Sequence, residues 1–128
     1  MAVAVSLRSS SAPSPLDGRV ILLVEDEPLI ALDVTSCLKS AGARVLSARG
    51  LQEGLRLADH PELAGAVLDF RLSGDDASTL CERLADRGLP FVLHGGYGHL
   101  PAARGAGVVI PKPARPQVLV TALATRLR

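Results

Sequence analysis

The sequence predicts an α/β fold of one domain, a doubly wound parallel sheet of five strands in the order 2-1-3-4-5 with helices on both faces. The first observation behind this prediction is that apolar runs of strand length alternate with stretches of helical periodicity from Arg19 onwards. Such alternation implies parallel strands joined by right-handed crossovers. The second is size and composition, because 128 residues with 48% hydrophobic and 21% charged residues suffice for a single buried core.

The chain is expected to divide into a flexible tail, residues 1–17, and one folded domain, residues 18–128. Serine and proline crowd the tail, and a segment of that composition buries too little apolar surface to order itself. The rest of the chain shows neither an internal repeat nor a break that would start a second domain.

The first half of the domain predicts two strands and two helices. Residues 20–24 are continuously apolar, which is typical of a strand covered on both faces. The next helix is expected to begin at Pro28, since proline suits the first turn of a helix, and to stop at Gly42. A strand at residues 44–48 and a helix over residues 51–59 follow.

The second half repeats this alternation, with a turn at Ser73 and Gly74 after its first strand. Its predicted elements are a strand at residues 65–69, a helix from Ala77 that ends at Gly88, strands at residues 90–94 and 108–110, and a helix from Arg115 to the C-terminus.

A weak fourth helix is expected between the last two strands. Glycine and proline recur there, and inside a helix glycine costs about 1 kcal/mol and proline about 3 kcal/mol. Any helix in this segment should therefore be short and mobile.

Three acidic residues follow strands that should be neighbours. Glu25 and Asp26 come directly after the first strand, and Asp69 ends the third. In a sheet of this order, ligands bind beyond the carboxyl ends of these two strands, where the strand order reverses. Like charges gathered there need a raised pKa or a bound cation, and oxygen ligands suit Mg²⁺. Taken alone, Glu25 and Asp26 also fit ordinary acidic residues at a helix start.

Lys112 supplies a positive charge at the end of the fifth strand. It lies between Pro111 and Pro113, which fix the local backbone and allow a cis X-Pro bond. A carboxylate, a divalent metal and a lysine together are typical of a site for phosphoryl transfer.

These motifs resemble the receiver domains of two-component response regulators. The resemblance rests on the run Val24-Glu-Asp-Glu-Pro28, the block Leu68-Asp69-x-x-Leu-Ser-Gly74 and the pair Lys112-Pro113, and it covers residues 19–128. It implies the flavodoxin-like form of the doubly wound fold. It also implies a signalling protein, not an enzyme, in which Asp69 accepts a phosphoryl group from a histidine kinase or a phosphotransfer protein.

The same resemblance implies the remaining site residues. Glu25, Asp26 and Asp69 would hold Mg²⁺, with the backbone carbonyl of Arg71 as a further ligand. Lys112 would contact the phosphoryl group, and its bond to the following proline would be cis. A stand-alone regulator of this kind is expected to signal by docking on an unidentified downstream protein, or by relaying or draining phosphoryl groups.

Two positions depart from the family pattern. Gly95 stands where these domains normally carry a Ser or Thr that binds the phosphoryl oxygen, and Val109 stands where they carry a switch aromatic. Two hypotheses follow. Either phosphorylation is retained, with a water or a backbone N–H replacing the hydroxyl, or this is a degenerate receiver that binds its partner whatever its phosphorylation state.

Other features carry weaker expectations. Because strand side chains alternate, His94 should face a helix layer if position 95 faces the site, and a packed histidine is favoured over a metal ligand. The final helix is apolar on more than one side, which fits either a homodimer or partner surface or a merely hydrophobic helix.

Several classes of function are disfavoured. The charges nearly balance and aromatics make up only 2%, so nucleic-acid and membrane binding are not expected. No signal peptide or spanning segment is recognised, which predicts a cytoplasmic protein. A phosphatase with an aspartate nucleophile usually has a second aspartate where this chain has Arg71, and a flavin binder needs an uncharged phosphate loop where Glu25-Asp26-Glu27 stands.

Overall fold

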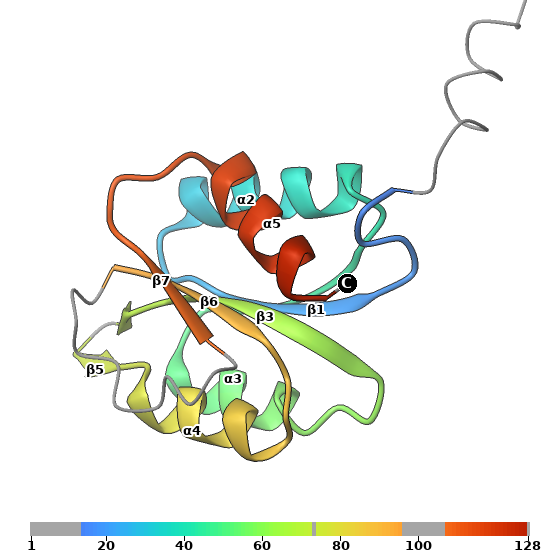
Figure 1. The fold of residues 1–128 in the computed structure, drawn as a ribbon. Coiled ribbons are helices and arrows are strands. Elements are labelled where there is room, and N and C mark those ends of the chain that lie inside the picture. The colour runs from blue at the N-terminus through green and yellow to red at the C-terminus, as the bar shows by residue number, and fades with distance from the viewer. Residues whose placement is uncertain (1–13, 73, 96–106, 128) are drawn as a thin grey trace, which may run out of the picture.

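The structure, a computed structural model, describes residues 14–72, 74–95 and 107–127, and it has the predicted architecture (Figure 1). A five-stranded sheet has the order β2-β1-β3-β6-β7, and every neighbouring pair is parallel. In the order in which these strands follow along the chain, this is the predicted 2-1-3-4-5. The strands are β1 (Val20–Val24), β2 (Arg44–Ala48), β3 (Leu63–Asp69), β6 (Phe91–His94) and β7 (Gly107–Ile110).

Helices cover both faces of the sheet (Figure 1). Helices α2 (Pro28–Ser40) and α5 (Pro116–Arg126) lie on one face, and α3 (Leu51–Leu57) and α4 (Ser78–Asp86) lie on the other. None of the helices in the described part of the chain is long and apolar enough to cross a membrane.

Burial on both faces of the sheet explains why strand β1 is continuously apolar. Its alternate residues Leu22 and Val24 pack into the core on the α3–α4 side, whereas Ile21 and Leu23 pack into the core on the α2–α5 side. All four side chains are at most 1% exposed. A strand buried on both faces cannot alternate apolar and polar residues, because either face would then bury a polar group.

The folded part begins earlier than residue 18, the start predicted from the sequence. Leu16 is fully buried in the α2–α5 core, and its backbone N–H donates a hydrogen bond to the carbonyl of Ala41 at 2.8 Å. Helix α2 stops as expected next to Gly42, whose φ of +96° favours glycine. A Cβ on Gly42 would lie 2.7 Å from the Cα of Asp17, so this residue also lets the incoming chain pass closely.

A small two-stranded sheet was not predicted. Strands β4 (Arg71–Leu72) and β5 (Asp75–Asp76) pair antiparallel around the turn that the sequence placed after Asp69. Strands of two residues are too short to leave a periodic pattern in a sequence. The weak fourth helix and the first thirteen residues of the tail lie outside the described residues, so both stay predictions.

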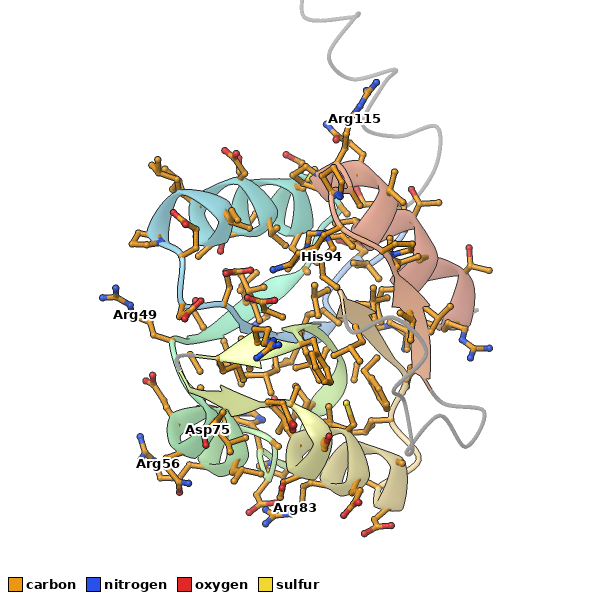
Figure 2. The ribbon with its side chains drawn as sticks, turned by 90° about the vertical axis from the view of Figure 1, so that its left-hand side faces the viewer. Arg49, Arg56, Asp75, Arg83, His94 and Arg115 are labelled. Carbon is orange, nitrogen blue, oxygen red and sulfur yellow. The ribbon has the colours of Figure 1, made fainter. Side chains whose placement is uncertain are left out.

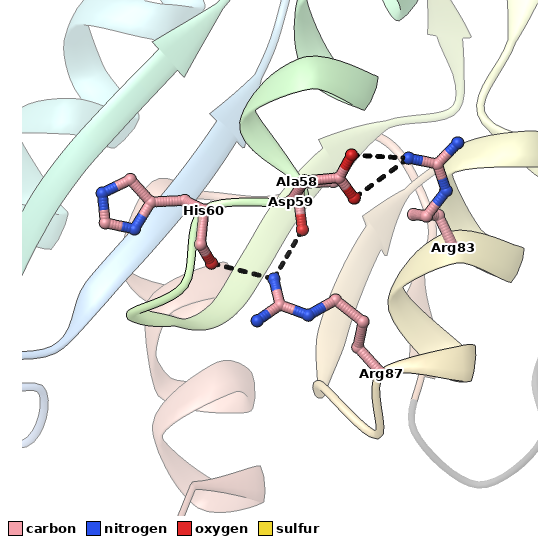
Figure 3. A network of polar contacts seen from close by, with 5 residues as sticks. All are labelled: Ala58, Asp59, His60, Arg83 and Arg87. Atoms are coloured by element: carbon pink, nitrogen blue, oxygen red, sulfur yellow. Dashed lines mark hydrogen bonds and ion pairs between the residues drawn. The ribbon is translucent and has the colours of Figure 1, made fainter.

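Polar contacts fasten α4 to the end of α3 (Figure 3). Arg83 of α4 forms an ion pair with Asp59 at 3.0 Å. Arg87, just after the helix, donates hydrogen bonds to the backbone carbonyls of Ala58 at 2.6 Å and His60 at 2.9 Å. The exposed ion pair contributes little energy by itself. The bonds to carbonyls satisfy backbone groups at the end of a short helix, where intrahelical partners are missing.

Candidate functional site

Three carboxylates meet beyond the carboxyl ends of β1 and β3, which are neighbours at the centre of the sheet. Glu25 and Asp26 follow β1 directly, and Asp69 is the last residue of β3. Each offers an oxygen, and these three oxygens lie within 4.8 Å of one another. The parallel pairing of Val24 with Leu68 sets this arrangement, because it brings the residues that follow the two strands to the same level.

Burial makes this cluster electrostatically strained. Glu25 and Asp69 are each only 4% exposed, and Asp26 is partly exposed. Burial, with a smaller contribution from the neighbouring Asp69, raises the pKa of Glu25 to about 7. The backbone N–H of Glu27, which donates to Glu25 Oε2 at 3.1 Å, acts in the opposite direction and lowers it. A buried carboxyl group with a raised pKa is stabilised in its charged form by a nearby positive charge.

Lys112 provides positive charge from the neighbouring edge. Its Nζ lies 2.8 Å from Asp69 Oδ1, although 39% of the lysine side chain is exposed. Burial alone would lower the pKa of Lys112, but the hydrogen bond and charge of Asp69, together with the charges of Glu25 and Asp26, outweigh it and raise that pKa. The Lys112–Pro113 peptide bond is cis, as the resemblance implied.

The donor set fits a hard divalent cation. All the donors in the cluster are carboxylate oxygens, the ligand type that Mg²⁺ prefers together with water. A dication would also offset the burial and the repulsion by Asp69 that together raise the pKa of Glu25. Arg71, whose backbone carbonyl the resemblance added to the ligands, begins β4 two residues beyond Asp69, with its side chain exposed.

The opposite side of the site is formed by the end of β6. His94 pairs with Asp69 across the two strands and is 6% exposed, packed toward the α2–α5 layer as the strand alternation predicted. Burial lowers its pKa, and the charge of Lys112 lowers it further, against an opposing effect of Asp69. Its Nε2 atom has no hydrogen-bond partner among the described residues.

Gly95 leaves room that Lys112 fills. The glycine has a φ of +96°, and its N–H donates to the carbonyl of Ile110 at 2.9 Å. A Cβ built here would lie 3.5 Å from Cε of Lys112, so the aliphatic part of the lysine passes directly over this position. Val109, in β7, is partly buried and packs against the core on the α3–α4 side.

Comparisons with known proteins agree on one family, although no family model matches the chain. The sensor protein TorS of Escherichia coli is 32% identical over 95% of this chain and 15% of its own length. The regulatory protein VanR of Enterococcus faecium is 31% identical over 84% of this chain and 49% of its own. The chain thus spans less than half the length of either relative.

Solved structures resemble the whole domain. A putative response regulator from Chloroflexus aurantiacus is 27% identical, with a TM-score of 0.72 over 87% of this chain and 98% of that one. A response regulator receiver protein from Sinorhizobium medicae gives a TM-score of 0.76 at 24% identity, over 88% of this chain and 96% of the other. This chain is a response-regulator receiver domain.

A further solved receiver domain bears on the acidic cluster. The receiver domain of sensor histidine kinase PA1611 from Pseudomonas aeruginosa holds a magnesium ion in its active-site cleft. It is 23% identical to this chain, with a TM-score of 0.70 over 86% of this chain and 98% of its own. Receiver domains are signalling modules of two-component systems rather than classical enzymes.

Proposed function

We propose that this receiver domain accepts a phosphoryl group on Asp69 in a reaction that depends on Mg²⁺ held by Glu25, Asp26 and Asp69. The donor is a phosphohistidine on a histidine kinase or a phosphotransfer protein. The phosphorylated domain then signals by docking on a partner protein or passes its phosphoryl group on. The observation that carries the proposal is the 2.8 Å ion pair between Lys112 and Asp69 beside two further carboxylates.

The chemistry is a transfer between two nucleophiles. A carboxylate oxygen of Asp69 attacks the phosphorus, the phosphorus–nitrogen bond breaks, and an acyl phosphate forms while the donor imidazole leaves. Such transfers are catalysed mainly by positioning and by neutralising charge on the phosphoryl oxygens. Mg²⁺ held by the three carboxylates would supply that neutralisation on one side, and on the other side Lys112 already lies within hydrogen-bond reach of the nucleophile.

Labelling with a small phosphodonor tests the nucleophile. Wild-type protein incubated with acetyl phosphate and Mg²⁺ should gain the mass of one phosphoryl group in intact mass spectrometry, and Asp69→Asn should gain none. Asp75→Asn is the matched control, because Asp75 is an exposed aspartate in the nearby β5. If the wild type gains no mass, or Asp69→Asn gains as much, the proposal is wrong and a receiver that acts without phosphorylation takes its place.

Calorimetry tests the metal separately. Titration of Mg²⁺ into the wild type should give saturable heat. Glu25→Gln should weaken the Mg²⁺ affinity by at least about tenfold, because even the loss of a residue that only hydrogen-bonds to a metal ligand lowers metal affinity by that factor. Glu27→Gln is the control, because the Glu27 side chain is exposed and the hydrogen bond to Glu25 comes from its backbone N–H. Equal affinities for the two variants would show that the acidic cluster does not hold the metal.

A further inference from the structure

A cavity lies between the sheet and the α2–α5 layer, next to Lys112. Its volume is about 240 Å³. Apolar side chains of both helices and of the segment between β7 and α5 form most of its wall, among them Ile30, Val34 and Leu119. Figure 2 shows His94, a buried member of the wall, between the sheet and the two helices. The space next to Lys112 is therefore open and mostly apolar.

Lys112 is fixed mainly at its tip. Its Nζ lies 2.8 Å from Asp69 Oδ1, while 39% of its side chain is exposed. The stem passes over Gly95, where a Cβ would lie 3.5–3.7 Å from the carbons Cγ, Cδ and Cε of the lysine, so position 95 offers only backbone for packing. A lysine stem is flexible, and sparse packing along it leaves the ammonium group able to move once its partner is lost.

Asp33 is the one carboxylate among the described residues that line the cavity. It belongs to α2 and is exposed, and no described residue forms an ion pair or a hydrogen bond with its carboxylate. Because Asp33 and Lys112 line the same empty volume, the path between them crosses open space and not packed side chains. A lysine stem packs favourably along an apolar wall while its ammonium group stays close to water. Asp33 is therefore placed to receive an ammonium group that crosses the cavity.

We propose that Asp33 is a second acceptor for the Lys112 ammonium group, and that the lysine crosses the cavity to Asp33 when Asp69 no longer holds it. In this second position the stem lies against the apolar wall, and Nζ forms an exposed ion pair with Asp33. Glu25 and Asp26 also attract Lys112, so the exchange is an equilibrium between two positions. Asp33 is then a positioning residue, which acts on the proposed phosphorylation through Lys112. This last consequence rests on the proposed function, whereas the exchange itself requires neither a metal nor a phosphoryl group.

Lysine-selective ¹³C labelling observes the exchange directly, because Lys39 and Lys112 are the only lysines of the chain. Nuclear Overhauser effects from the Lys112 Hε protons to methyl groups of the apolar wall report the second position, in buffer without metal or phosphodonor. Asp69→Asn should strengthen these effects relative to the wild type. The double variant Asp33→Asn/Asp69→Asn should weaken them again by about two- to fivefold, which is the effect of one exposed ion pair. Lys39 is the internal reference, because it lies at the exposed end of α2.

Two further variants in the Asp69→Asn background separate a specific partner from a general loss of charge. Glu27→Gln removes an exposed acid next to α2 that does not line the cavity, and it should leave the effects unchanged. Asp33→Glu keeps the acid and should retain them. Equal effects with and without Asp33 would overturn its role as an acceptor, and no effect from Lys112 to the wall in Asp69→Asn would overturn the exchange. Neither result bears on the labelling of Asp69, so the proposed function stands or falls separately.

Discussion

The two halves of the candidate site are built in opposite ways. The β1–β3 half is dense in charge, with three carboxylates whose oxygens lie within 4.8 Å of one another. The β6–β7 half contains one lysine, a buried histidine that faces away into the helix layer, and a glycine without a side chain. In the proposed function, the first half would supply several ligands for a cation, and the second would supply Lys112 as a cationic group for a phosphoryl oxygen.

This difference teaches how each half would respond to substitution. On the β1–β3 half, loss of Glu25 would weaken a cation site but leave two other carboxylates beside it, whereas Asp69, the proposed nucleophile, has no substitute. On the β6–β7 half, Gly95 offers no hydroxyl, and its N–H is already committed to the carbonyl of Ile110. Among the described residues of this half, Lys112, whose aliphatic stem occupies the space over the glycine, would therefore contact the phosphoryl group in the proposed function.

Removal of Lys112 should give the largest effect, on the rate of phosphorylation. It should also distinguish the two halves, because labelling and Mg²⁺ binding should change in different ways. Lys112→Met should slow acetyl phosphate labelling by about 100-fold or more, the usual effect of losing one preorganised donor to a developing charge. The same variant should bind Mg²⁺ as tightly as the wild type or more tightly, because a positive charge near the carboxylates is gone. Intact mass spectrometry and calorimetry measure the two effects.

The control for that variant is Lys39→Met, which removes the chain's other lysine from the exposed end of α2. It should change neither labelling nor metal binding. Labelling of Lys112→Met within threefold of the wild type would show that another group carries the role assigned to this lysine.

The pH dependence of the free energy of unfolding should reveal the raised pKa of Glu25 in the β1–β3 half. The folded pKa of Glu25, about 7, exceeds its usual value of 4.5, so the folded state holds its proton more tightly than the unfolded state. Its contribution to stability is then complete below pH 4.5 and is lost as pH rises through 7. Without metal, this loss should reach about 3 kcal/mol at most, at about 1.4 kcal/mol per pKa unit.

The difference between wild type and Glu25→Gln isolates this effect, measured by urea unfolding in EDTA between pH 5 and 8. The subtraction is needed because the lowered pKa of His94 acts in the opposite direction: the folded state binds that proton less tightly, so stability from this residue rises with pH. Saturating Mg²⁺ should flatten the difference. A wild type and variant with parallel pH profiles in EDTA would contradict the raised pKa.

Replacement of Gly95 should give the smallest effect, a modest loss of stability. Gly95→Thr adds the hydroxyl that the family pattern normally has, and its Cβ would meet Lys112 at ordinary contact distance. The φ of +96° is unfavourable for a side chain, however, so the variant should lose about 1–2 kcal/mol of stability. Chemical denaturation measures this loss of stability. Gly50→Thr is the control, because Gly50 has an extended φ of −154° and a Cβ built there would meet nothing within 4 Å.

An unchanged stability for Gly95→Thr would show that the backbone at this position adapts to a side chain. The absence of the hydroxyl would then be a matter of side-chain chemistry and not of conformation.

Most of the sheet could be predicted from local patterns. Residues 20–24 and 44–48 form strands with the predicted bounds, because each lies between clear breakers and is short enough to read without ambiguity. The start of β3 was placed two residues late, at Gly65 instead of Leu63. Ends of elements depend on pairing with a neighbouring strand, which a local pattern does not contain.

The features that the sequence could not supply depend on contacts between distant segments. Leu16 looked like part of a polar tail, and only its packing against α2 makes it a core residue. His94 could be assigned to a helix layer, but the cavity beside it depends on how α2 and α5 happen to pack. The convergence of Glu25, Asp26 and Asp69 could be expected, since the topology alone brings the ends of β1 and β3 together.

The place where the described chain enters and leaves the domain has a practical consequence. Leu16 and Leu127 lie at the pole where β1 begins, and Arg19 joins the two regions by donating to the carbonyl of Leu127 at 3.4 Å (Figure 1). The acidic cluster occupies the other pole, beyond the strand ends. A fluorophore, an affinity handle or a surface tether attached at Ser14 or Leu127, the two ends of the described chain, would therefore leave the cluster facing solution, ready for immobilised binding assays.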